Sequence, residues 1–301
     1  MSSLDALNKR YGFAGELVFE AGPGGLPIAR ITNDYGEATI ALQGAQVLQW
    51  EPQDEAPVIW LSKDAKFARG KSVRGGVPVC WPWFGAHASE ASYPAHGFAR
   101  TTGWSVVATE QRPDGGTQIV FRLDPTDATR AQWPNRTPVE NVITVGAALD
   151  VELVTRNEGN KPVTIGEALH TYFNIADIET ASVTGLDGRD YLDKVRDMAR
   201  DRQQGPVRFT GETDRIYLDT GDSCAIDDPG LNRRILIRSR GARATVVWTP
   251  WRDKADKMGD LGPDGWKHVV CVETANAAEH RVTIAPGTEH RMAAAYSVEV
   301  L

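Results

Sequence analysis

Hydrophobic and polar residues alternate along much of this chain with a period of two. Such alternation is typical of β-strands, in which successive side chains point to opposite faces. We therefore expect strands at residues 38–50, 104–109, 118–123 and 142–156. The last segment alternates in the same way, with apolar residues at every second position from Met292 to Val300. The dominant expectation is a chain built from strands.

Turn-forming residues separate these runs. The clearest turns are Pro113–Gly116, Asn157–Asn160, Asp228–Gly230 and Pro286–Gly287. Frequent strand–turn units, together with 29 glycines and 17 prolines, favour an all-β fold, a large antiparallel β-sandwich or barrel. Helical patterns are scarce, and short helices are expected only at Ser3–Tyr11 and Thr126–Trp133. No repeat, low-complexity tract or linker-like change of composition is present, so residues 1–301 are expected to form one domain.

Two segments depart from the strand pattern. Residues 72–100 contain Gly75-Gly76, Trp81-Pro82-Trp83-Phe84 and His96-Gly97 and predict a long, ordered, aromatic-rich loop. Loops of this length are usually functional. Residues 251–266 are polar and rich in glycine, and we expect them to form a rim just before the segment around Glu273.

Composition and charge restrict the classes of function. The net charge of −7 argues against nucleic acid or an anionic membrane as a partner, and an anionic small molecule would need a local cationic pocket. The N-terminal stretch lacks the apolar segment of a signal peptide, and no run approaches the length of a membrane span. Three cysteines without metal-type spacing are expected to be free thiols in a reducing cytoplasm.

Two ionisable residues stand in apolar, strand-like sequences. His170 lies in Gly-Glu-Ala-Leu-His-Thr-Tyr-Phe, and Glu273 lies in Val-Val-Cys-Val-Glu-Thr-Ala-Asn. A charge in such surroundings is costly unless something compensates it. An acid and a base placed in this way are suited to proton transfer on a neutral substrate. The structural alternatives are a hydrogen-bonded core histidine and a buried salt bridge of Glu273.

Four further residues are candidates for binding. Arg74 precedes Gly75-Gly76, where backbone and ligand can approach closely and leave the guanidinium free to bind an anion. Arg100 is a second candidate for the same anion, although either arginine could instead form a surface ion pair. His96 is a candidate polar contact beside Gly97, and Asp214 could accept hydrogen bonds from ligand hydroxyl groups.

Other catalytic motifs are absent. The chain has no Gly-x-Gly-x-x-Gly, no Walker loop, no Gly-x-Ser-x-Gly and no His-Glu-x-x-His, and its six histidines lack the i,i+2 or i,i+4 spacing of metal ligands. We therefore expect no metal and no cofactor, which leaves acid–base catalysis or no catalysis. Trp81, Trp83 and Phe84 are either packing residues or a platform for the apolar face of a sugar ring.

Five motifs, taken in order, resemble the aldose 1-epimerase superfamily, and within it the hexose-6-phosphate mutarotase branch. The motifs are Val73–Pro78 with Cys80–Gly85, Ala95–Arg100, Glu167–Phe173, Thr213–Tyr217 and Val272–Asn276. The resemblance extends from about residue 15 to the C-terminus. It implies a galactose-mutarotase-like β-sandwich with the sugar site on a concave sheet.

The resemblance also implies a mechanism. Glu273 would take the proton of the anomeric hydroxyl group while His170 protonates the ring oxygen, and the ring would reclose on the other face after rotation about the C1–C2 bond. Arg74 and Arg100 would hold the phosphate, Asp214 the sugar hydroxyl groups, and His96 would assist near the ring. The substrate would be a small-molecule sugar phosphate, most simply glucose 6-phosphate.

Two alternatives remain open from the sequence. The first is a mutarotase for unphosphorylated aldoses, which differs in the role of Arg74 and Arg100. The second is a non-catalytic carbohydrate-binding or regulatory β-sandwich, against which the presence of both His170 and Glu273 speaks. Nothing in the sequence indicates association, so a monomer is expected.

Overall fold

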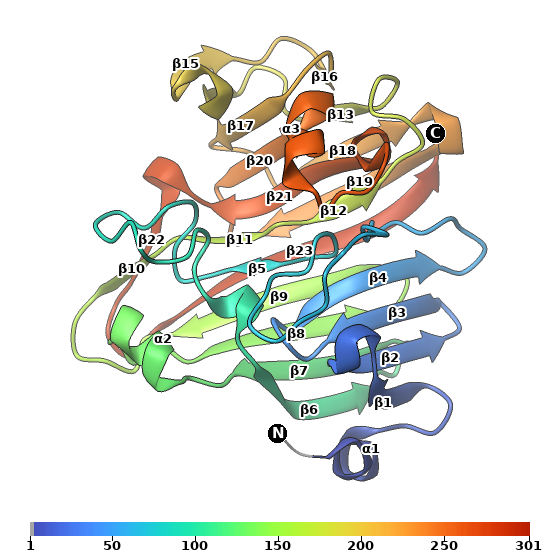
Figure 1. Ribbon diagram of the computed structural model, residues 1–301, viewed down its shortest axis with the longest axis vertical. Helices are drawn as coiled ribbons and strands as arrows, with labels where there is room; N and C mark the ends of the chain where they lie inside the picture. Colours follow the sequence, from blue (N-terminus) through green and yellow to red (C-terminus); the bar gives the residue numbers. More distant parts are fainter. Residues whose placement is uncertain (1–2) are drawn as a thin grey trace.

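Antiparallel strands dominate the structure, a computed structural model that describes residues 3–301 (Figure 1). Met1 and Ser2, which belong to the predicted domain of residues 1–301, lie outside the described residues. The described strands form sheets of nine, eight, four and two strands.

The nine-stranded sheet has the order β16-β13-β18-β19-β23-β9-β8-β7-β6. Its strands are β6 (Trp104–Gln111), β7 (Thr117–Leu123), β8 (Val139–Val145), β9 (Leu149–Arg156), β13 (Ser182–Thr184), β16 (Val207–Arg208), β18 (Ser223–Asp228), β19 (Arg233–Arg240) and β23 (Glu289–Val300).

The eight-stranded sheet has the order β15-β14-β17-β20-β21-β11-β5, and β12 also pairs with β21. Its strands are β5 (Val79–Cys80), β11 (Glu167–Leu169), β12 (Tyr172–Asn174), β14 (Asp190–Asp193), β15 (Ala199–Arg202), β17 (Thr213–Leu218), β20 (Ala244–Thr249) and β21 (Val269–Asn276). All eight residues of β21 are buried, as expected for a strand inside a sheet that is covered on both faces.

The two smaller sheets complete the strands. They contain β1 (Leu17–Ala21), β2 (Pro27–Asn33), β3 (Gly36–Ala41) and β4 (Gln46–Pro52) in one sheet, and β10 (Val163–Ile165) with β22 (Val282–Ile284) in the other. The described helices are α1 (Leu4–Tyr11), α2 (Asp127–Gln132) and α3 (Trp251–Met258), with short 3-10 turns η1 (Pro23–Gly25), η2 (Ala99–Thr101), η3 (Lys194–Arg196), η4 (Pro229–Leu231), η5 (Gly265–His268) and η6 (Ala278–His280).

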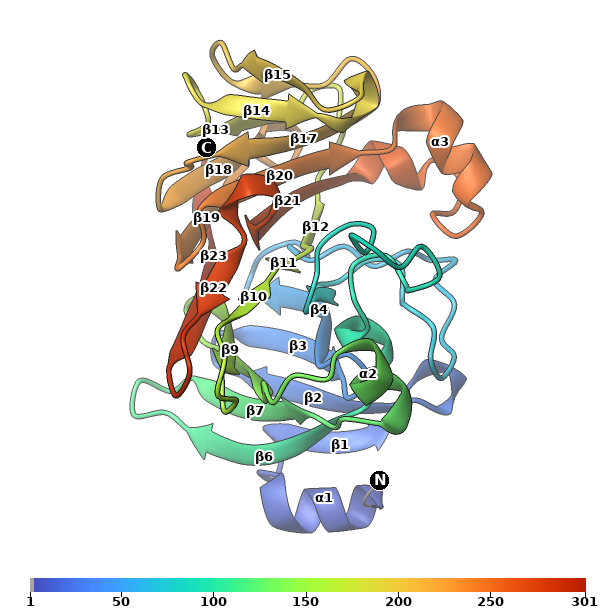
Figure 2. The same cartoon turned by 90° about the vertical axis from the view of Figure 1, so that its left-hand side faces the viewer.

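The sheets are stacked as a sandwich. The nine-stranded sheet runs along the molecule, with the eight-stranded sheet against its upper part and the four-stranded sheet against its lower part (Figures 1 and 2). Phe173 of β12 packs edge-on against Tyr296 of β23 with ring centroids 5.2 Å apart, and Asn141 of β8 donates a hydrogen bond to the carbonyl of Ala45. The predicted antiparallel β-sandwich is thus confirmed.

The predicted strands at residues 104–109 and 118–123 are confirmed as β6 and β7. The two longer predicted segments are also β-structure, but each is two strands and not one. The segment 38–50 is two strands, because the chain turns at Gly44 and Ala45, which have φ of 78° and 44°. The segment 142–156 is likewise the hairpin of β8 and β9, with the turn between Val145 and Leu149. Alternation of apolar residues continues through each turn, so the period alone does not reveal it.

Both predicted helices are confirmed, since Ser3 caps α1 and Thr126 caps α2 with their side-chain oxygens. The helix α3 was not predicted, and it occupies the first half of the segment expected to be a polar rim. Its sequence is strongly polar with one buried residue, Ala255, so it lacks the apolar stripe that marks a helix in sequence. Residues 72–100 are a long loop that contains β5 and the first two residues of η2.

No described helix is both long and apolar enough to cross a bilayer. The predicted free thiols are confirmed, since Cys80, Cys224 and Cys271 are buried and unbridged.

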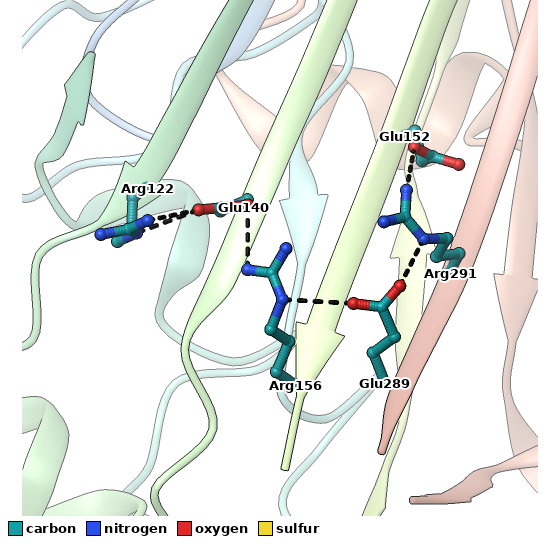
Figure 3. Close-up of polar contacts among 6 residues, drawn as sticks. All are labelled: Arg122, Glu140, Glu152, Arg156, Glu289 and Arg291. Carbon is teal, nitrogen blue, oxygen red and sulfur yellow. Dashed lines mark hydrogen bonds and ion pairs between the residues drawn. The ribbon is translucent and has the colours of Figure 1, made fainter. Parts of the chain in front are cut away.

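Charged side chains form a ladder across four neighbouring strands of the nine-stranded sheet, β7, β8, β9 and β23 (Figure 3). Glu140 of β8 binds Arg122 of β7 at 2.6 Å and Arg156 of β9 at 3.0 Å. Arg156 also forms an ion pair with Glu289 of β23. Glu289 pairs with Arg291, and Arg291 pairs with Glu152 of β9, the last residue of the ladder. Opposite charges that alternate in neighbouring strands stabilise the pairing of those strands.

Candidate active site

A pocket of about 300 Å³ opens on one face of the eight-stranded sheet. All six residues predicted to form a site line it: Arg74, His96, Arg100, His170, Asp214 and Glu273. The remaining lining residues are Ser72, Val73, Pro78, Phe84, Tyr172, Lys194, Val246, Trp248 and Lys254.

His170 and Glu273 are cross-strand neighbours in this pocket. The pairings of Leu169 with Thr274 and of Tyr172 with Cys271 share one register, which places His170 directly opposite Glu273. Paired residues of antiparallel strands point to the same face. The Nε2 atom of His170 lies 3.4 Å from Oε1 of Glu273. The predicted acid and base therefore meet, although 102 residues separate them in sequence.

The apolar residues around His170 predicted a continuous strand, but the structure has two short strands there. His170 and Thr171 form a break between β11 and β12. The His170 amide donates to the carbonyl of Pro78 at 3.0 Å, on the other side from β21, and the Thr171 hydroxyl is 2.7 Å from the hydroxyl of Tyr296. The paired strands on both sides of the break fix the position of His170.

Burial sets the ionisation of the pair. It raises the pKa of Glu273 well above its usual value, and Asp214 raises it further, whereas Lys194 and Arg100 lower it. Burial also lowers the pKa of His170 well below its usual value, with added repulsion from His96, Arg100 and Arg74. Both effects favour uncharged forms, because each charge is costly in a pocket with little water. One proton shared between the two groups is the state that this environment favours.

The atoms of the pair that face away from each other are also buried. Oε2 of Glu273 and Nδ1 of His170 have no hydrogen-bond partner among residues 3–301. Buried polar atoms are nearly always satisfied unless they serve a function. Their lack of partners marks the pair as a candidate for function.

His96 lies in the long loop, where it closes the segment that begins after Phe84. Its amide donates to the carbonyl of Gly85 at 2.7 Å, and its φ of 67° is in the left-handed region, as is that of Gly97. Its ring centroid is 5.7 Å from that of His170. Burial and the charges of Arg100 and Lys194 lower the pKa of His96 to about 3, so it is neutral and can act as a hydrogen-bond partner rather than a cation.

The two predicted arginines differ in how they are held. Arg74 donates to Asp260 at 3.1 Å and to the Tyr172 hydroxyl at 2.9 Å. Burial opposes its charge, yet Tyr172 and Asp260 together raise its pKa above the usual value. Arg100 donates to the carbonyl of Ala95 at 3.0 Å and has no carboxylate partner among residues 3–301. The guanidinium of Arg100 is therefore the cation of this pocket best placed to accept an anion.

Asp214 stands on β17, two strands from Glu273. It pairs in register with Trp248, Trp248 pairs with Cys271, and Cys271 is two residues from Glu273 on the same face. Asp214 is not a free acceptor, because Lys194 lies 2.9 Å from its Oδ2 atom. The pocket therefore contains the ion pair of Lys194 and Asp214 beside the pair of His170 and Glu273.

Several pocket residues were missed from the sequence. Lys194, Lys254 and Trp248 lie outside the predicted site motifs, and Tyr172 lies inside one of them without having been singled out. Asp260, the partner of Arg74, was missed as well. Lys254 and Asp260 belong to the predicted rim, so their region was foreseen but their roles were not. A lone lysine next to a turn, such as Lys194, carries no signal in a single sequence.

The aromatic residues of the long loop have different roles. Trp81 and Trp83 are 2% and 8% exposed and belong to the hydrophobic core, which supports packing. Phe84 lines the pocket and packs edge-on against His96, with centroids 4.8 Å apart. Of the three, only Phe84 can offer a face to a ligand in this pocket.

Comparison with known proteins identifies the family. Residues 27–297 match the model of the family described as Aldose 1-epimerase. The chain belongs to the aldose 1-epimerase family. It is 40% identical over 244 residues, 81% of each chain, to a protein of Escherichia coli (strain K12) named "Putative glucose-6-phosphate 1-epimerase".

Solved structures of similar proteins share the fold. The crystal structure titled a "putative mutarotase (YeaD)" from Salmonella typhimurium has a TM-score of 0.89 and 33% identity, and the match covers 97% of this chain and 96% of the other. A galactose mutarotase related enzyme from Lactobacillus acidophilus, 15% identical over 90% of this chain and 97% of the other, has a TM-score of 0.71 and supports the fold alone. The predicted superfamily, its β-sandwich and an isomerase that acts on a sugar are thereby confirmed.

Proposed function

We propose that this protein interconverts the α and β anomers of a hexose 6-phosphate, with glucose 6-phosphate as the expected substrate. The observation that carries the proposal is the meeting of His170 and Glu273, 3.4 Å apart, in a pocket that also holds Arg100 without a carboxylate partner. The names of the relatives from Escherichia coli and Cenchrus ciliaris, the second 33% identical over 263 residues, agree with this substrate.

The proposed reaction proceeds from the form of the pair in which its single proton is on His170 and Glu273 is ionised, and it needs one proton transfer at each end of the hemiacetal. Glu273 takes the proton of the anomeric hydroxyl group while His170 gives a proton to the ring oxygen, and the C1–O5 bond breaks to give the open aldehyde. Rotation about C1–C2 presents the other face of the carbonyl, and reclosure returns both protons. Each positioned group contributes on the order of 10²–10⁴ in rate.

Recognition of the phosphate is assigned to Arg100 and Arg74. Because the chain carries a net charge of −7, binding of an anion has to be recovered locally. Charge-assisted hydrogen bonds contribute about 1.5–3 kcal/mol each, so two arginines can favour the phosphorylated sugar by on the order of 10²-fold or more. Asp214 is assigned to sugar hydroxyl groups, and His96 to a neutral contact near the ring.

An assay of anomerisation tests the proposal directly. Fresh α-glucose 6-phosphate is mixed with the protein, and the β anomer is followed with a β-specific dehydrogenase, with α-glucose run in parallel. We expect faster conversion of the phosphate, and at least a hundredfold loss in His170→Ala and in Glu273→Gln with the fold retained. Unchanged rates in both variants would remove this mechanism.

The alternative substrate, an unphosphorylated aldose, is separated by Arg100→Ala. This change should reduce kcat/KM for glucose 6-phosphate by roughly tenfold to a hundredfold and leave that for glucose nearly unchanged. Arg130→Ala is a matched control, since Arg130 also donates to the carbonyl of the residue five positions before it, but outside this pocket. Equal losses on both sugars would favour the unphosphorylated substrate.

We further propose that residues 1–301 act as one monomeric domain in the cytoplasm, without a nucleic-acid or membrane partner. The net charge of −7 supports the absence of a nucleic-acid or anionic-membrane partner, and the three buried free thiols support the cytoplasm. Sedimentation analysis that finds a stable dimer would contradict the monomer.

A further inference from the structure

Lys194 and Asp214 lie opposite each other at the edge of the pocket. In the antiparallel pairing of β14 with β17, Asp193 is opposite Arg215, so Lys194, directly after Asp193, comes opposite Asp214, directly before Arg215. Their charged atoms are 2.9 Å apart, with side-chain exposures of 33% and 12%. The contact therefore follows from the register of the sheet.

The turn that carries Lys194 is fixed by Asp193. The buried Asp193 carboxylate accepts hydrogen bonds from the amide of Val195 at 3.0 Å and from Arg196 at 3.0 Å, and its carbonyl accepts from Met198 at 2.8 Å. Asp197 and Met198 both have positive φ, 50° and 63°, so the chain reverses sharply directly after η3. These contacts hold the backbone of Lys194 in place before any ligand arrives.

Asp214 and Glu273 are carboxylates on the same face of one sheet. Without a cation between them, each would oppose a negative charge on the other. The titratable and charged groups around Glu273 come from several elements: His170 between β11 and β12, Asp214 on β17, Lys194 on η3, Arg100 on η2, Cys271 on its own strand, Cys80 on β5, Tyr172 on β12 and Tyr296 on β23. Among these groups, Lys194 is the one that touches Asp214.

We propose that Lys194 is a positioning residue for the reaction: it pairs with Asp214, so that Asp214 does not oppose the negative charge that Glu273 carries during proton transfer. The inference rests on the proposed function, because it assigns Lys194 through the acid–base pair. Since Lys194 also lowers the pKa of Glu273, its electrostatic effect agrees with the geometry.

Lys254 provides a matched control in the same pocket. It pairs at 2.5 Å with Glu212, two residues before Asp214 in sequence, and it is carried by α3, whereas Lys194 is carried by η3. Lys194→Met and Lys254→Met remove the same charge and nearly the same volume. The two variants differ in which carboxylate loses its partner.

The decisive measurement is kcat/KM against pH for the wild type, Lys194→Met, Lys194→Arg and Lys254→Met. Loss of a positive charge beside the pair makes every proton in it harder to remove, so both limbs of the Lys194→Met profile should move to higher pH by roughly one unit. Lys194→Arg should restore the wild-type profile, and Lys254→Met should leave both limbs in place. Thermal unfolding of each variant checks that the fold is retained.

Three results would overturn the assignment of Lys194. The first is a Lys194→Met profile that coincides with the wild type. The second is an equal shift in Lys254→Met, which would show that the total charge of the pocket matters and the pairing with Asp214 does not. The third is a Lys194→Arg profile that is not restored to that of the wild type.

Two further measurements distinguish a failure of the proposed function from a failure of the inference about Lys194: kinetics on glucose, and a titration of Glu273 without substrate. If the wild type converts glucose as fast as glucose 6-phosphate, the substrate proposal fails, while the shift is still measured on glucose. Infrared difference spectra against Glu273→Gln follow the carboxyl group of Glu273 without any turnover. Its midpoint should rise in Lys194→Met and stay unchanged in Lys254→Met, and equal midpoints in all variants reject the inference.

Discussion

The imidazole of His170 lies parallel to the phenol ring of Tyr172, with 9° between the ring planes and 5.0 Å between the centroids. The hydroxyl of the same tyrosine accepts a hydrogen bond from Arg74 at 2.9 Å. One side chain thus supports the proposed acid with its face and the proposed anion-binding arginine with its hydroxyl. The two functions can be separated by substitution.

We expect Tyr172→Phe to affect binding and Tyr172→Ala to affect both binding and turnover. Phenylalanine keeps the ring beside His170 but leaves Arg74 without one partner, so KM for the sugar phosphate should rise by roughly five- to tenfold with little change in kcat. Alanine also removes the packing, and kcat should fall by at least about tenfold. Steady-state kinetics measure both.

Tyr217→Phe is the control for removal of a buried hydroxyl. Tyr217 donates to Gln203 at 2.8 Å and does not line the pocket. A rise of KM in Tyr217→Phe as large as in Tyr172→Phe would mean that the effect is structural and not due to Arg74.

The pH dependence of kcat/KM should reflect the shifted pKa values of the pair, lowered for His170 and raised for Glu273. The usual pKa of histidine is 6.5, and burial places that of His170 well below it. As pH falls, the singly protonated pair gains its second proton on His170 at this lowered value, so the acid limb should lie below pH 6.5. As pH rises, the last proton leaves from Glu273, whose pKa is raised, and activity should persist into neutral pH. An acid limb at or above pH 6.5 would contradict this order.

Gly97 should not tolerate a side chain. Its φ is +70°, and a Cβ atom there would lie 2.0 Å from the carbonyl oxygen of Trp81, which accepts the amide of Phe98. Gly97→Ala should cost about 2 kcal/mol or more in unfolding free energy and should displace His96. Chemical denaturation and the anomerisation rate give the two readouts.

Gly85→Ala isolates the conformational part of that cost. Gly85 has a similar φ of +76°, but a Cβ atom there meets nothing within 4 Å. We expect a loss of only about 1 kcal/mol, which is the ordinary cost of a left-handed alanine. Equal losses at the two glycines would show that the contact with Trp81 is unimportant.

The charge ladder of the nine-stranded sheet should make stability depend on pH. Burial opposes ionisation of Glu140, but hydrogen bonds from Arg122 and Arg156 hold its pKa below the usual value of 4.5. A carboxyl group with a lowered pKa in the folded state stabilises the fold above its unfolded pKa, and the contribution disappears as pH falls through the folded pKa. Below about pH 4.5, therefore, this contribution should decline.

Glu140→Gln measures the contribution of that carboxylate. We expect a loss of about 1 kcal/mol at pH 7, which shrinks at low pH because the wild type then loses the same charge. Glu152→Gln, at the end of the ladder with Arg291 as its partner, should cost less. Denaturant midpoints at pH 7 and at pH 3 test this, and a pH-independent difference would contradict it.

Much of the fold and most of the proposed site were accessible from the sequence. Alternation of apolar residues predicts the strands, because a side chain on a sheet faces either the core or the other side, and this periodicity is local. His170 and Glu273 stood out because ionisable groups in apolar runs need compensation wherever the chain places them. The loop of residues 72–100 could be predicted because its glycine, proline and aromatic residues interrupt the alternating pattern, which is also a local feature of the sequence.

The tertiary structure decided what depends on register and on turns. The reversals at Gly44–Ala45 and Val145–Leu149 continue the alternating pattern, so only the folded backbone separates the strands there. The pairing of Lys194 with Asp214 and the bond of Arg74 to Asp260 join positions 20 and 186 residues apart. Nothing in the sequence near a lysine or an arginine specifies which carboxylate will lie beside it, because that is fixed by how strands far apart in the chain are aligned.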